Sequence, residues 1–175
     1  PMQRHLFHIA RWSRLAIVLA IIGVLALTGP ARAQAPAPTL RIVPARSQIN
    51  IDEIVAVQVW AENVSNLVSV EIQLRYDQAI LEANAASITP GSFFTPQPGM
   101  LDSSAGGGII TYNADGTQGA GNSGVLFSIN MQGRASGTAT IDKLSDIAVF
   151  FTFKTPDGSE SGVNPVVIGA QITVG

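Results

Sequence analysis

Acidic side chains gather in one segment of the sequence, where Glu62, Glu71, Asp77 and Glu82 follow one another closely. Glycoside hydrolysis needs two carboxyl groups about 5 to 9.5 Å apart across a cleft, so this cluster is the first candidate for catalysis. Asp77, however, is predicted to be a turn residue that caps the segment Gln78–Glu82. No recognisable catalytic motif accompanies these acids, so we expect no catalytic residues and no enzymatic activity.

Other chemistries are limited by which residue types are present. His5 and His8 are the only histidines, and the chain has no cysteine. If the amino terminus is removed, a Ser-His-Asp or Cys-His nucleophile, a His-ligated zinc and a disulfide framework are all excluded. The segment Asp115–Asn122 loosely suggests a calcium loop but lacks alternating carboxylates and a terminal glutamate. A flexible hairpin loop is the better interpretation, and we predict neither a metal site nor a cofactor.

The amino terminus has the pattern of an export signal. Arg4, Arg11 and Arg14 precede an uninterrupted apolar run of 13 residues from Leu15 to Leu27, and Ala31-Arg-Ala33 fits a cleavage site. An apolar run of this length is shorter than the roughly 18 to 20 residues that cross a bilayer. The sequence therefore predicts a helical signal peptide over residues 1–33, cleavage near Ala33, and a secreted product that is not held in a membrane.

Removal of the signal changes the charge of the chain. Six basic residues then face twelve acidic ones, which is a net charge of −6. Nucleic acid binding requires a basic face, so that class of partner is excluded. Residues 34–38 are a Pro/Ala linker, and residues 39–175 are predicted to form one domain, large enough to bury a core without disulfides.

The clearest element of this domain is a strand that runs from Leu67 to Tyr76. Its apolar residues alternate with polar ones, which is the pattern of a strand with one face on a core and one in solvent. The row predicted to face the core consists of Val68, Val70, Ile72, Leu74 and Tyr76, and the solvent row consists of Ser69, Glu71, Gln73 and Arg75.

Further β-rich runs alternate with turn-rich connections, and nothing indicates a long amphipathic helix. Between residues 83 and 108 the sequence is looser, with Phe93 and Phe94 expected to enter the core, and residues 115–124 are predicted to form a mobile loop. Eight or nine short strands with frequent turn signals predict an all-β sandwich or jelly roll. The remaining expected strands are residues 39–43, 55–60, 109–114, 125–131, 137–141, 147–153 and 166–174.

Several of these fragments together resemble the cohesin domains of bacteria, in the order and spacing that the family shows over residues 39–175. The fragments are Asn63–Leu67 before the long strand, Tyr76-Asp77-x-x-x-Leu81 after it, Gly108–Tyr112 with Asp115, Gly124–Ile129, Gly137–Ile141 and Ile172–Val174. The resemblance implies a nine-stranded β-sandwich with jelly-roll topology that binds a dockerin, a calcium-loaded helical pair, on one sheet face. The calcium would belong to the dockerin.

The resemblance also implies which residues would contact a dockerin-type partner. Polar residues of the family's third strand and an acid after its fifth strand bond the dockerin, which corresponds here to Ser69, Glu71 and Asp115. The family commonly has aspartate where this chain has Glu71, so its preference among dockerins cannot be transferred. The full predicted set is Ser69, Glu71, Gln73, Tyr112, Asp115, Leu126 and Ser128.

Two other interpretations stay open at this point. The polar row of the long strand can be the ordinary solvated side of a sheet. Trp60, with Tyr112, can be a stacking platform of a carbohydrate-binding module for polysaccharide, or Trp60 can simply cover the edge of the sandwich. A purely structural or adhesive surface module is a third role that the same scaffold can have.

Overall fold

The computed structural model describes residues 35–175, and residues Pro36–Gly175 form one compact unit. The predicted signal peptide, its cleavage site and the first linker residue lie outside the described residues. Within them, no helix has the length and apolar character that crossing a membrane requires. The unit consists almost entirely of strands, with one short 3-10 helix, η1 (Ala85–Ser87).

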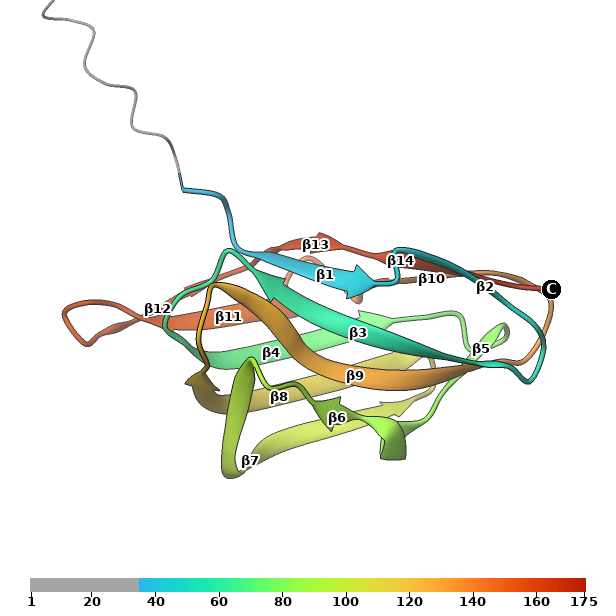
Figure 1. Ribbon diagram of the computed structural model, residues 1–175, viewed down its shortest axis with the longest axis horizontal. Coiled ribbons are helices and arrows are strands. Elements are labelled where there is room, and N and C mark those ends of the chain that lie inside the picture. Colours follow the sequence, from blue (N-terminus) through green and yellow to red (C-terminus); the bar gives the residue numbers. More distant parts are fainter. Residues whose placement is uncertain (1–34) are drawn as a thin grey trace, which may run out of the picture. The chain divides into compact units, whose positions relative to one another are not determined.

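Two sheets face each other, which confirms the predicted all-β sandwich (Figure 1). In the first sheet β3 is the middle strand, and β6 pairs with β9 beside the main path. Its strands in spatial order are β13 (Val166–Ile168), β1 (Thr39–Val43), β3 (Ile54–Glu62), β9 (Ser123–Gly133) and β5 (Leu81–Ala83), and β6 spans Thr89–Pro90.

The second sheet is built around β4 (Leu67–Arg75), which is the long strand predicted from alternation. One edge of β4 pairs with β8 (Ile109–Gln118), and β8 pairs in turn with β7 (Phe94–Gly106). The other edge pairs with β11 (Val149–Lys154) along most of its length and with β10 (Gly137–Lys143) at its end. Beyond these lie β12 (Glu160–Val163), β14 (Ala170–Val174) and β2 (Arg46–Ile49).

The two ends of the chain cross between the sheets side by side. β1 pairs in parallel with β13 in the first sheet, and β2 pairs in parallel with β14 in the second. Gly169 lies at the second crossing, where a Cβ atom would be 2.6 Å from the carbonyl oxygen of Ile141. Only glycine therefore fits there without a backbone shift, and the two crossings close this side of the sandwich.

The core consists of the inward rows of both sheets. Leu40, Val59 and Phe127 of the first sheet and Ile72 and Phe151 of the second are fully buried. Phe93 and Phe94 enter this core as predicted, with 6% and 0% of their surface exposed. Burial of such side chains is the main favourable contribution to folding.

The structure corrects several details of the predicted strands. Val68 is half-buried, because a β-bulge between β4 and β11 lets Leu67 take the core position instead. The looser middle segment contains the 13-residue strand β7, and β8 continues through Gln118 where a loop was predicted. The described residues form fourteen strand segments instead of nine, and the unpredicted ones include the short strands β2, β5, β6 and β12.

Candidate functional site

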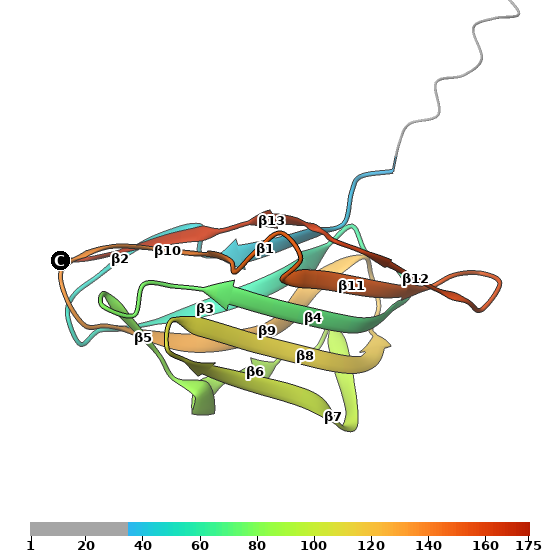
Figure 2. The same ribbon diagram turned by 180° about the vertical axis from the view of Figure 1, so that it is seen from behind.

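The outer face of the second sheet brings together polar side chains from neighbouring strands. Figure 2 shows β12, β11, β4, β8 and β7 side by side on this face, which we call the docking face. Because directly opposed residues of an antiparallel pair point to the same side, the register places the outward residues of β4 next to those of β8. Ser69 lies opposite Asp115, Glu71 opposite Asn113 and Gln73 opposite Thr111.

Strand β7 extends the docking face by one more row. Asp102 lies opposite Asn113 and Ser104 opposite Thr111, so the carboxylates of Asp102 and Glu71 flank Asn113 from the two neighbouring strands. Asp115 completes a rim of three acids around a shallow depression of about 350 Å³. The ion pairs in the described part of the chain involve other acids, so these three carboxylates are not neutralised by salt bridges within it.

The docking face also has an aromatic residue that no sequence pattern indicated. Phe150 of β11 lies opposite Glu71, between the buried Val149 and Phe151, and is itself half-buried. Its outward neighbours on β11 are Thr152 and Lys154. An outward phenylalanine therefore lies among polar side chains, beside the acidic rim.

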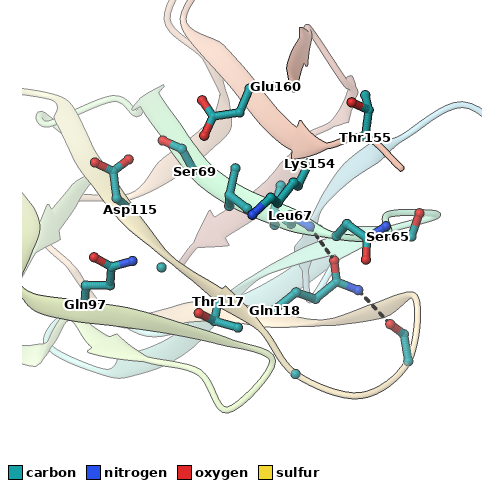
Figure 3. A pocket seen from close by; sticks show the side chains of 15 residues that line it. Ser65, Leu67, Ser69, Gln97, Asp115, Thr117, Gln118, Lys154, Thr155 and Glu160 are labelled. Atoms are coloured by element: carbon teal, nitrogen blue, oxygen red, sulfur yellow. Dashed lines mark hydrogen bonds between the residues drawn. The ribbon is translucent and has the colours of Figure 1, made fainter. Parts of the chain in front are cut away.

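A larger groove adjoins the docking face at the end where β4 begins. It has a volume of about 930 Å³ and is lined by hydroxyl, amide and charged side chains that include Ser69, Asp115, Lys154 and Glu160 (Figure 3). Gln118 stiffens the floor of this groove. Its Oε1 accepts a hydrogen bond from the Leu67 amide at 2.9 Å, and its Nε2 donates to the carbonyl oxygens of Gly121 at 2.7 Å and Val64 at 3.2 Å.

Four of the predicted partner-binding residues lie together on the docking face, namely Ser69, Glu71, Gln73 and Asp115. Ser128 lies on the other sheet, where it pairs with Gln58 of β3 and Thr89 of β6. It therefore cannot share a contact surface with the other four.

Tyr112 and Leu126 were predicted to lie on the surface, and the structure shows that this is wrong. Both are 0% exposed. Tyr112 lies on the inward row of β8 and stacks on Phe127 with ring centroids 4.3 Å apart, and burial raises the pKa of its hydroxyl to about 12. At Leu126 the register between β3 and β9 shifts by one residue, which places it in the core next to Phe127.

Trp60 lies on the outer face of the first sheet, away from the docking face. It is half-buried, it pairs with Arg41 and Val125, and its Nε1 donates to Gln58 at 3.2 Å. Arg41 binds both carboxylate oxygens of Glu62, at 2.7 and 3.0 Å, and this hydrogen-bonded pair lowers the pKa of Glu62. Since Tyr112 is in the core, the two-residue sugar platform is not formed.

The docking face is broad and open, with polar side chains around one half-buried aromatic ring. The described residues contain no group of three His, Cys, Asp or Glu side chains placed to hold a metal ion together. Protein interfaces commonly combine aromatic residues near their centre with polar residues around them.

Comparison of the sequence and the structure with known proteins shows which family the chain resembles. The family model described as "Cohesin domain" matches residues 42–175. The seventh ScaB type I cohesin of Pseudobacteroides cellulosolvens superposes with a TM-score of 0.66 at 18% identity, covering 79% of this chain and 92% of that one. No curated protein sequence matches the chain.

Two further solved structures widen this comparison. A non-cellulosomal cohesin from the archaeon Archaeoglobus fulgidus has a TM-score of 0.60 at 17% identity, covering 80% of this chain and 92% of that one. The cohesin of a Clostridium thermocellum cohesin–dockerin complex has a TM-score of 0.56 at 14% identity, covering 83% and 98%. The family match over most of the sequence, together with this shared sandwich, shows that the chain belongs to the cohesin domain family.

Proposed function

We propose that this cohesin domain is a secreted, non-catalytic module that binds a dockerin-type protein, and that the partner lies on the docking face. The observation that supports this best is the placement of Ser69, Glu71 and Asp115. They come from two strands and are well separated in sequence, yet the register brings them together beside Phe150 on one open sheet face. The calcium in such a complex belongs to the dockerin.

The acidic rim of the docking face favours a partner with basic side chains. Glu71, Asp102 and Asp115 are available for charge-assisted hydrogen bonds, which are stronger than neutral ones. Complementary charge mainly accelerates association and selects among partners. Dockerin binding should therefore weaken as salt is added, through a slower association rate.

The proposal is tested by capture from a displayed library of dockerin modules, with the purified chain as bait in calcium and in EDTA. We expect dockerins to be captured in calcium only. The double variant Glu71→Lys with Asp115→Lys should abolish capture, since it turns two acids of the docking face into bases. Trp60→Ala, on the other sheet, is the matched control and should capture normally. A bait that recovers no dockerin in calcium contradicts the proposal.

A further inference from the structure

Phe150 and Gly162 occupy the same space on the docking face. A Cβ atom on Gly162 would lie 2.1 Å from Cζ and 2.4 Å from Cε1 of the Phe150 ring, far inside the distance that real side chains tolerate. Gly162 is on β12 opposite Thr152, whose side chain points outward with that of Phe150. The tip of the ring therefore lies over the backbone of the edge strand, in the place of the missing side chain.

The backbone at Gly162 does not itself require glycine. It is not among the residues with positive φ, so an L-amino acid could adopt its conformation. What excludes a side chain there is the ring of Phe150. Glycine in a strand weakens the strand and commonly marks a close approach of another group, which here is an aromatic ring on the solvent side.

This contact holds the ring in one orientation without burying it. Phe150 stays half-exposed, and the residues beside it on neighbouring strands are polar, with Glu71 on β4 and Thr152 next along its own row. Among the outward positions of β4, β8 and β11, Phe150 is the only aromatic. The apolar surface at the ring itself is therefore small and fits a single aliphatic side chain, while Met100 and Leu101 of β7 add exposed apolar surface at the acidic depression.

We propose that Phe150 is the specificity-determining anchor of the docking face, and that Gly162 is the positioning residue that presents it. The proposal rests on the proposed function and adds the chemistry of the partner to it. The partner places one aliphatic side chain of a helix on the Phe150 ring, next to the acidic rim. Binding energy at interfaces concentrates in such rigid anchors, surrounded by contacts that mainly exclude water.

The test measures the affinity of the captured dockerin for the full chain and for its variants Phe150→Ala, Gly162→Ala and the double variant. Phe150→Ala should weaken binding by about thirtyfold or more, as expected for an interface hot spot. Gly162→Ala keeps the ring but pushes it off the sheet, so it should weaken binding by about tenfold. Once residue 150 is alanine, Gly162→Ala should have no further effect, because its effect passes through the ring.

Controls separate this role from a merely structural one. Each variant should retain its cooperative thermal transition, and nuclear Overhauser contacts between the Phe150 ring and the residue 162 backbone should be lost in Gly162→Ala. Trp60→Ala should bind as the unmodified chain does.

Each outcome of the experiment is decisive. A change below about threefold for Phe150→Ala, with Glu71→Lys still disruptive, overturns the anchor while the docking face stands. Independent effects of the two substitutions in the double variant overturn the positioning role of Gly162. An unmodified chain that captures no dockerin at all overturns the proposed function, and this inference with it.

Discussion

The hydroxyl of Tyr112 gives a direct test of how the core is packed. The side chain is 0% exposed, and its ring stacks on Phe127 at an interplanar angle of 13°. In the described part of the chain its Oη has no hydrogen-bond partner. A buried polar group left unsatisfied costs about 1 to 3 kcal/mol. Tyr112→Phe keeps the ring and its stacking, so it should raise the free energy of unfolding by about 1 to 2 kcal/mol.

The same residue gives the stability a dependence on alkaline pH. Burial raises the pKa of Tyr112 to about 12 in the folded protein, whereas in the unfolded chain its ordinary value is about 10. Above pH 10 the unfolded state loses this proton first, so the folded state loses stability as pH rises from about 10 to 12. The loss from this group is about 2.3 kcal/mol at pH 12, and Tyr112→Phe should not show it.

Urea unfolding at pH 7 and across pH 9 to 11.5 measures both effects, with the slope of the transition serving as a check on compactness. Tyr76→Phe is the matched control, because the Tyr76 hydroxyl is not among the buried groups without a partner, and that variant should gain no stability. If Tyr112→Phe unfolds more easily than the unmodified chain at pH 7, the hydroxyl is hydrogen-bonded and the reasoning is refuted.

Three further predictions concern other parts of the scaffold. Gly91→Ala should lower the free energy of unfolding in urea by about 2 kcal/mol or more, because its Cβ would lie 2.0 Å from the Val125 carbonyl oxygen. The neighbouring Ser92→Ala is the control and should leave the free energy of unfolding unchanged. Gln118→Ala removes the hydrogen bonds to Leu67, Val64 and Gly121 and should lower the free energy of unfolding by about 2 to 3 kcal/mol. Thr117→Ala, at an exposed position, is the control. An unchanged urea unfolding transition of Gln118→Ala would show that these hydrogen bonds do not stabilise the fold. The pKa of the Asp157 carboxyl, measured by NMR, should be about 2, because the Thr155 hydroxyl, the Ser159 hydroxyl and the Ser159 amide donate hydrogen bonds to its charged form. Thr155→Val should raise this pKa. The stability from this group is present above its ordinary pKa and is lost as pH falls toward 2.

The long strand shows how far alternation predicts structure. The solvent row Ser69, Glu71 and Gln73 was predicted, because a period of two fixes which side chains share a face. Val68 was assigned to the wrong side because a bulge shifts the phase of the pattern at that residue. Leu126 was misassigned for the same reason, at the irregularity between β3 and β9. A bulge depends on the partner strand, so the sequence of one strand does not reveal it.

Strand β7 and the outward Phe150 are the other main features that the sequence analysis missed. In the segment that forms β7, Pro98 and Gly99 lie in an irregularity between Pro96 and Leu101, and the residues on both sides of it pair with β8 as an edge strand. Asp102 was missed as a docking-face residue because its strand was not predicted. Phe150 was missed because a single aromatic within an apolar run does not indicate which way it points; its orientation follows from the pairing with Glu71.

Glycines within strands have one physical role that explains several of these positions. A Cβ on Gly116 would lie 2.4 Å from the Thr95 carbonyl oxygen and 2.8 Å from the Phe94 ring, and a Cβ on Gly124 would lie 2.5 Å from Phe93. These two glycines make room for rings that are buried in the core, where the ring is needed for stability. Gly162 makes room for Phe150 in the same way but on the solvent side, where the fold gains much less from the contact. Glycine destabilises the edge strand, and the contact with Phe150 adds little to the core in return. For this reason we propose that the Phe150 ring contacts a partner and does not mainly stabilise the fold.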